Sequence, residues 1–428
     1  MRFDLEQIDL HRPQRYATQG FPWREWDQLR EEAPVFWYAR DDIEPFWVVT
    51  RHADVMTVSE NAKTFINGGP RLRLALKGEP ELLKGGLDSF GKSRGWNPHE
   101  PPDITFMDDP RHRHTRKLAS WAFTQGCMRE VGAHFDALAE TFTDEFVAAL
   151  ETRGECDFVH ELAAKLPLAA TGEILGLPPD DWKHLLAWSN AIIGEVEPEH
   201  IRPGETLAQA AERNMNDLRG YLEALIHEHR RPGGGPSPFI NRLVNGRVDG
   251  ELLNEQQLNS YLFLLIGAGN DTTRNATTGG LVALLEHPEQ RDMLVRDPAL
   301  IPGAVDEILR WTSPVISFLR TVTEDCTLNG TRLRAGDTVC VFYPSANRDD
   351  RVFADPYRFD ITRDPNPYIT FGFGAHFCLG ANLAKAELRA VLKALRRVLP
   401  RLALTGEARR IANTHVSGFA LLGVRATA

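Results

Sequence analysis

A ten-residue stretch, 371–380, contains the residue with the most evident chemistry; it reads Phe-Gly-Phe-Gly-Ala-His-Phe-Cys-Leu-Gly, and its thiol is Cys378. The three glycines allow turns and close backbone approaches that a side chain would block. Backbone amides in such a turn can point at sulfur, and a helix beginning near Leu379 would direct its positive end at it. Both effects favour a thiolate, which suits a metal ligand better than a disulfide partner. The alternative is a buried, inert cysteine, which is the usual fate of a lone thiol.

The same stretch resembles the haem-ligand loop of the cytochrome P450 family, whose pattern is Phe-Gly-x-Gly-x-His-x-Cys-x-Gly, and every fixed position is matched. In that family a cysteine thiolate ligates the haem iron. The resemblance therefore implies haem b (iron protoporphyrin IX) as cofactor, O2 as co-substrate and Cys378 as the iron ligand. It implies haem contacts for four further residues of the loop: Phe371, Gly372, His376 and Gly380.

A basic stretch that follows Pro110 is a second candidate for haem binding, because a proline is well placed to start a helix. His112 and Arg116 stand four residues apart, so they would share one helical face, where two donors can bind a pair of carboxylates. The commoner fate of such a charge run is a solvated face. In the family a His-x-x-x-Arg pair on this helix holds the haem propionates, and Arg320 falls where the family places another propionate-binding arginine.

The longest helical pattern, 251–286, has a polar interruption in its apolar middle, where Gly, Asp and Thr weaken a helix interior. Such a conflict inside a strong element indicates function. The resemblance implies the family's Ala-Gly-x-Asp-Thr segment over the oxygen-binding face of the haem, with Ala268 and Gly269 against the cofactor. There Thr272 would donate a hydrogen bond and Asp271 would feed a proton relay. The alternative for the threonine is a simple bond to the carbonyl one turn earlier.

Glu307 and Arg310 stand three residues apart in a helical stretch and can pair. An exposed pair would contribute only about 0.2–0.5 kcal/mol. In the family this Glu-x-x-Arg pair is buried and closed by an arginine from a later loop, to which Arg358 corresponds. Removing one of three buried charges would leave the others uncompensated at a cost of several kcal/mol, so we expect a structural triad.

The resemblance also implies a substrate pocket. Part of the pocket would come from 313–320, which reads as a loop entering a strand because it combines a proline with β-branched residues. The implied pocket residues are apolar: Ala268, Val315, Ile316, Phe318 and, in the turn of a final hairpin, Val416. A long aperiodic loop, 67–104, would help to roof the pocket. The segment 194–206 would connect two lid helices or be a plain surface loop.

The implied fold is mainly α-helical with small β-sheets, a triangular helix-rich prism with the haem between the long central helix and the cysteine loop. With 428 residues, 42% of them hydrophobic, the chain has ample material for a large core. We expect one domain, 1–428. Its β-rich part would be 30–66, 313–370 and 400–428, and its α-rich part 108–312 and 379–399.

Composition excludes several classes of protein. A formal net charge of -10 makes a nucleic-acid role unfavourable, since phosphate binding needs an accumulated basic surface. The five cysteines are scattered and odd in number, which argues against a disulfide framework and a zinc site. No run of about 18 apolar residues and no export signal is evident, so we expect a cytoplasmic protein without a membrane anchor. We also expect a monomer.

Electrons must come from another protein, because the chain has neither a flavin-binding segment nor a cysteine cluster for iron and sulfur. A ferredoxin with its reductase is the expected donor, and Arg113, His114 and Lys117 are candidate contacts. The predicted function is a monooxygenase that hydroxylates a steroid, a terpenoid or a branched lipid. Two alternatives remain open: a haem-thiolate peroxygenase, which would not need the Asp-Thr pair, and a non-catalytic haem sensor or carrier.

Overall fold

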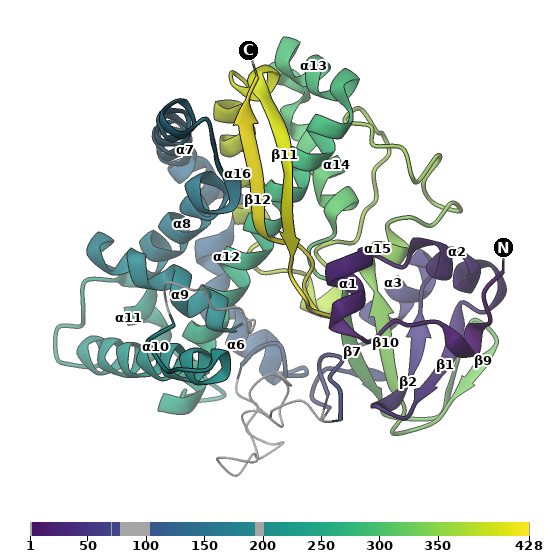
Figure 1. The fold of residues 1–428 in the computed structure, drawn as a ribbon. Coiled ribbons are helices and arrows are strands. Elements are labelled where there is room, and N and C mark those ends of the chain that lie inside the picture. The colour runs from purple at the N-terminus through teal and green to yellow at the C-terminus, as the bar shows by residue number, and fades with distance from the viewer. Residues whose placement is uncertain (1, 70, 78–102, 193–200, 428) are drawn as a thin grey trace.

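The computed structural model describes residues 2–69, 71–77, 103–192 and 201–427. Most of the predicted roof loop, 67–104, and half of the predicted lid connection, 194–206, lie outside these residues. The described residues form a mainly helical fold with small sheets, as expected from the sequence (Figure 1).

Helices occur in both parts of the molecule in Figure 1: most lie away from the large sheet, and those near the amino terminus lie beside it. Their bounds are α1 Pro13–Gln19, α2 Trp23–Glu32, α3 His52–Glu60, α6 Arg111–Ser120, α7 Gln125–Arg153, α8 Lys165–Leu175, α9 Trp182–Ile192, α10 Leu207–His229, α11 Pro238–Asn245, α12 Glu255–Glu286, α13 Pro288–Arg296, α14 Ile301–Thr312, α15 Tyr343–Ala346 and α16 Ala381–Leu395. A π-helical turn, Val159–Ala163, precedes α8. Helix α12 is central and packs against α8, α9, α10, α14 and α16.

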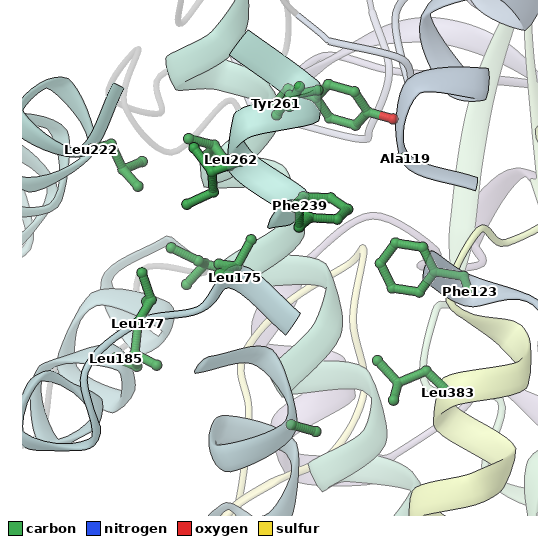
Figure 2. Close-up of a cluster of buried hydrophobic side chains, with 14 of the residues drawn as sticks. Ala119, Phe123, Leu175, Leu177, Leu185, Leu222, Phe239, Tyr261, Leu262 and Leu383 are labelled. Atoms are coloured by element: carbon green, nitrogen blue, oxygen red, sulfur yellow. The ribbon is translucent and has the colours of Figure 1, made fainter. Parts of the chain in front are cut away.

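Helix α12 starts at a capping box, in which the side chain of Asn254 accepts from the backbone of Gln257 and the Gln257 side chain accepts in return. Its amino-terminal half is buried in the largest apolar cluster. Figure 2 shows Leu262 of α12 surrounded by side chains from α8, α10 and α11, with Tyr261 turned toward α6. Apolar packing of this kind fixes the position of the whole helix, including its polar middle.

A five-stranded sheet has the order β1 (Val35–Arg40), β2 (Ile43–Val49), β10 (Thr338–Phe342), β7 (Ser317–Val322) and β3 (Phe65–Ile66). The pairing of β2 with β10 is parallel and the other pairings are antiparallel. Two strands predicted near the amino terminus therefore join strands almost 300 residues later. This sheet carries the stretch that was expected to border the substrate.

The final hairpin, β11 (Leu402–Arg410) and β12 (Phe419–Ala426), forms as predicted but gains a third strand, β4 (Glu155–Asp157). The sequence analysis had placed 155–157 within the helical part. A strand of three residues leaves no alternating pattern to detect, because it is shorter than two periods of a strand. The short strands β8 (Cys326–Leu328) and β9 (Thr331–Leu333) pair with each other.

Candidate active site

The cysteine loop is a pair of tight turns held by its own backbone. The amide of Cys378 donates to the carbonyl of Phe371 over 2.9 Å, and the amide of Phe377 donates to Gly374 over 3.1 Å. Gly372 and Gly374 both have φ of 72°. A Cβ on Gly374 would lie 2.5 Å from the carbonyl oxygen of Ser59, so both a left-handed backbone and a close approach require glycine there.

The thiol of Cys378 receives the backbone N–H of Gly380, and α16 begins one residue later, at Ala381. Burial nevertheless raises the pKa of Cys378, outweighing this N–H group and the positive charge of Arg116. The expectation that the loop by itself favours a thiolate is therefore wrong, because desolvation is the larger effect. A bound metal ion deprotonates a coordinating thiol outright, so the loop suits a thiolate formed on iron.

A group of cationic and imidazole side chains converges beside this loop. Arg116 on α6 donates to the carbonyl of Phe377 over 2.6 Å. The ring of His112 lies 4.0 Å, centroid to centroid, from that of His376. Burial and the nearby charges of Arg116 and Arg320 lower the pKa of His376 to about 2, so this imidazole is neutral at physiological pH and donates to the carbonyl of Met107.

The two arginines of this group lack anionic partners within the part of the chain that the structure describes. Neither Arg116 nor Arg320 forms an ion pair with a carboxylate there, although Arg320 is buried. Nε2 of His112 is buried and has no hydrogen-bond partner among the described residues. Buried cations and orphaned donors favour an anionic ligand, because their desolvation is otherwise uncompensated. The two propionates of a haem fit this donor set, and the thiol fits its iron.

The middle of α12 presents one open position between buried neighbours. Ala268 is exposed, whereas Ile266 and Gly267 on one side and Asn270 and Asp271 on the other are buried. An exposed alanine between buried neighbours marks a face on which none of the described residues is packed. The haem-contact prediction for Ala268 is compatible with this exposure. Gly269 faces α8, where a Cβ would lie 3.1 Å from the hydroxyl of Thr171.

Asp271 and Thr272 point in different directions from α12. The hydroxyl of Thr272 is partly exposed and donates to the carbonyl of Ala268 over 2.9 Å, which is the simple back-bond considered as an alternative. Its oxygen keeps lone pairs that can accept a proton donor from the open face. Asp271 is buried, and burial raises the pKa of its carboxyl to about 6, against the opposing effects of Arg274 and Ser189.

The predicted structural triad is correct for two of its three members. Glu307 and Arg310 are fully buried and form a two-point pair at 2.7 and 2.8 Å. The third arginine is Arg363, whose Nε lies 3.3 Å from Glu307. The side chain of Arg358 is 64% exposed, and its nearest carboxylate is Asp360 at 3.9 Å, so its assignment to the triad is wrong.

The direction of one backbone carbonyl explains why Arg363, and not Arg358, is the third member of the triad. The carbonyl of Arg358 turns inward and accepts from Arg310 over 3.2 Å and from Arg363 over 2.9 Å. Because the carbonyl of Arg358 faces the buried charges, its side chain points away from them. Arg363 follows in Asp-Ile-Thr-Arg, and nothing in the spacing alone separates it from Arg358 as the third member.

Four of the five predicted pocket residues remain candidates. Val315 forms a β-bridge with Val416, which brings the tail turn against the entry to β7. Phe318 packs against Leu72 and Phe106. Ile316 is wholly buried with Leu10 and Trp26 in another cluster, and its prediction as a pocket residue is wrong. Successive residues of an extended chain point to opposite sides, so Val315 and Ile316 cannot both face the pocket.

The three predicted contacts for a ferredoxin lie on α6. Arg113 and Lys117 are exposed. Nδ1 of His114 lies 2.6 Å from Oδ1 of Asp249, so this imidazole already has an acidic neighbour. Arg113 and Lys117 thus remain candidate contacts for an acidic partner.

Several buried polar residues near the site escaped the sequence analysis. They are Ser189 and Asn190 on α9, Arg274 on α12 and Glu387 on α16. The half-buried Arg363 escaped it as well. Single serines, asparagines and glutamates in amphipathic helices are ordinarily solvent-facing, so their types gave no signal. Arg274 could have been noticed, since it follows Asp271 at the i,i+3 spacing that favours pairing.

The family model for Cytochrome P450 matches residues 299–399. The methyl-branched lipid omega-hydroxylase of Mycobacterium tuberculosis is 36% identical over 92% of this chain and 89% of its own. The steroid C26-monooxygenase of the same organism is 37% identical over 77% of this chain and 79% of its own.

The crystal structure of a Mycobacterium marinum cytochrome P450 in complex with pseudoionone matches with a TM-score of 0.85 and 32% identity, covering 99% of both chains. Within the described residues, no helix combines the length and the apolar character needed to cross a bilayer. The sequence matches cover most of the length of both relatives, and the two folds agree closely. The chain thus belongs to the cytochrome P450 family and is a monooxygenase of that family, with haem b as cofactor and O2 as co-substrate.

Proposed function

We propose that this monooxygenase hydroxylates a hydrophobic small molecule of the steroid, terpenoid or branched-lipid class, with two electrons from a ferredoxin and its reductase. The observation that carries the proposal is the exposure of Ala268, one turn before Thr272, in the middle of a helix where Ile266, Gly267, Asn270 and Asp271 are buried. An apolar substrate that covers this face gains stabilisation from buried area. The names of the two mycobacterial relatives support the substrate class.

In this proposal the cofactor is held by the cysteine loop and by the cationic and imidazole side chains beside it. Haem, when bound, supplies an iron centre that accepts electrons and activates dioxygen. Cys378 would ligate the iron, and Phe371, Gly372 and Gly380 would contact the cofactor. Arg116 and Arg320 bind propionates by charge-assisted hydrogen bonds, and Nε2 of His112 is available as a further donor. His376, whose N–H is bonded to Met107, packs its ring against that of His112.

Proton delivery and exclusion of water are the work of α12 and the pocket. Asp271 takes up a proton and passes it toward the hydroxyl of Thr272, which is oriented by its bond to Ala268. A carboxyl whose pKa is about 6 can both take up and release protons near neutral pH. Ala268, Val315, Phe318 and Val416 give the substrate an apolar wall that keeps bulk water from the reacting centre.

The test is a panel of steroids, terpenes and methyl-branched fatty acids, added to the haem-loaded protein while the haem absorption is recorded. We expect spectral shifts on binding, followed by product that consumes reduced nicotinamide only when a ferredoxin and its reductase are present. Binding confined to small polar or aromatic acids would contradict the substrate class. Product formation with peroxide, but none with the electron-transfer proteins, would contradict the electron source.

A further inference from the structure

Helices α9 and α12 are joined by a chain of buried polar groups in an otherwise apolar contact. The members are Ser189 and Asn190 from α9, and Asn270, Asp271 and Arg274 from α12. All five side chains are more than nine-tenths buried. Buried polar groups destabilise a fold unless they are paired, so we expect these five residues either to be paired with one another or to serve the function.

The hydroxyl of Ser189 has one proton, and its direction follows from its neighbours. The amide nitrogen of Asn270 donates to Oγ of Ser189 over 2.9 Å. Ser189 in turn donates to Oδ1 of Asp271 over 3.0 Å. Because Oγ already accepts from an amide, its own hydrogen is free to point at the carboxyl.

The same carboxyl oxygen also faces a guanidinium. Nη2 of Arg274 lies 3.2 Å from Oδ1 of Asp271, and its Nη1 donates to Oδ1 of Asn190 over 2.6 Å. Helix α9 thus holds Asp271 directly through Ser189 and indirectly through Asn190. Oδ2 of Asp271 is buried as well, but it has no hydrogen-bond partner among the described residues.

The two oxygens of Asp271 are therefore unequal. Oδ1 accepts from two donors, which makes it a poor place for a proton, whereas Oδ2 keeps its lone pairs available. We propose that Ser189 and Arg274 are positioning residues that anchor Asp271 through Oδ1 and leave Oδ2 as the atom that takes up and releases the proton. This inference rests on the proposed function in one respect, namely that Asp271 belongs to the proton relay.

Other charged groups around α12 face elsewhere. Arg274 is the charged side chain that acts on the Asp271 carboxyl, where it opposes the effect of burial. Glu387 on α16 meets α12 at Thr273, more than half a helical turn around from Asp271. Glu161 of the π-helical turn binds Arg153.

The carboxyls of α8 and α14 are likewise engaged away from Asp271. On α8, Glu173 lies 2.5 Å from the ring of His134. On α14, Glu307 binds Arg310 and Arg363. Loss of the Ser189 hydroxyl removes one of the two influences that lower the pKa of Asp271.

An infrared titration of the haem-loaded, substrate-free protein tests the anchor without turnover. The carboxyl C=O band absent from Asp271→Asn identifies the protonated Asp271, and its loss with rising pH gives the midpoint. We expect Ser189→Ala to move this midpoint upward by about 0.5–1 pH unit, the effect of one lost hydrogen bond to the ionised form. The C=O band should also shift in frequency, since Oδ1 loses a donor.

Thr143→Val is the matched control, because it removes a buried hydroxyl without a partner among the described residues, on α7. Its Asp271 midpoint should equal that of the parent. Asn190→Ala is a second variant, in case Ser189→Ala folds poorly. It removes an acceptor from Arg274 and should change the Asp271 band while Oδ1 keeps Ser189.

Turnover supplies the second readout. With a substrate found in the panel, Ser189→Ala should shift the pH dependence of product formed per nicotinamide consumed in the same direction as the infrared midpoint, with unchanged substrate affinity. An unchanged midpoint and an unchanged pH profile in a folded Ser189→Ala protein would overturn the inference. Absence of coupled turnover in the parent protein would instead overturn the proposed function, and the infrared result would still decide the anchor.

Discussion

Nε of Arg363 lies 3.3 Å from Oε2 of Glu307, so one fully buried carboxylate is shared by two guanidinium groups. Backbone and side-chain N–H groups of Asp360 and Asn366 also donate to it, over 2.9 and 3.2 Å. The loop that precedes the cysteine is thereby fastened to α14. This charge cluster therefore holds the chain segment that leads into the Cys378 loop, although none of its members lies in that loop.

Arg363→Ala should destabilise the protein, because it removes one cation from a buried cluster and leaves the remaining charges less well compensated. We expect the free energy of unfolding to fall by about 3 kcal/mol, the lower end for a broken buried pair, since Arg310 remains. Arg358→Ala is the matched control and should change stability by less than about 0.5 kcal/mol, as exposed substitutions do. Denaturant unfolding of both variants checks this, and equal losses would restore Arg358 to the triad.

The two arginines beside the cysteine loop, Arg116 and Arg320, lead to a prediction about cofactor retention. Arg320→Ala should speed the loss of haem to an acceptor protein about 10- to 100-fold, because a hydrogen bond to a charged group contributes about 1.5–3 kcal/mol. Arg320→Lys should recover part of the loss. Arg129→Ala, an exposed arginine on α7, is the control and should keep the parental rate. A parental rate in Arg320→Ala would show that this arginine does not hold a propionate.

The sequence predicted what depends on fixed local spacing and missed what depends on tertiary pairing. The cysteine loop and the Asp271–Thr272 pair are contiguous, so their types and order carry the information. The side chain of Arg363 points inward and that of Arg358 points outward. The inward direction of the Arg358 carbonyl decides this, and residue spacing carries no information about it. Ser189 acquires its role only because α9 lies on α12, 81 and 82 residues from its partners.

Glu387 on α16 provides a prediction about pH and stability. Burial raises the pKa of its carboxyl to about 8, against a smaller lowering by the hydroxyl of Thr273. Between the unfolded pKa of about 4.5 and the folded value, the unfolded chain has released this proton while the folded protein keeps it. The unfolded state therefore binds fewer protons, and this group lowers stability progressively as pH rises through that window.

Glu387→Gln should remove this pH-dependent penalty, since an amide of similar shape stays neutral in both states. Relative to the parent, the variant should gain stability between pH 5 and pH 8, by about 1.4 kcal/mol for each unit of the pKa difference that is lost. Unfolding curves at several pH values measure the gain. Glu130→Gln, at an exposed position on α7, is the control. A constant difference between Glu387→Gln and the parent across this range would contradict the assignment.

Exposed cations on α6 give the final prediction, which concerns the electron donor. Arg113 and Lys117 lie on the helix whose Arg116 reaches the cysteine loop, so an acidic protein bound there would approach the haem side of that loop. Arg113→Glu with Lys117→Glu should slow reduction by an acidic ferredoxin at least 10-fold at low salt, because electrostatic steering accelerates association by 10- to 1,000-fold. The defect should shrink as salt screens the charges.

The control for this experiment is Arg231→Glu with Arg334→Glu, two exposed arginines outside α6, whose substitution changes the net charge equally. If net charge alone governed association, both double variants would be slowed alike. If α6 is the docking site, only the first is slowed, and reduction by a small uncharged chemical reductant stays the same in both. Stopped-flow reduction separates these cases, and parental rates in the α6 variant would place the donor on another face.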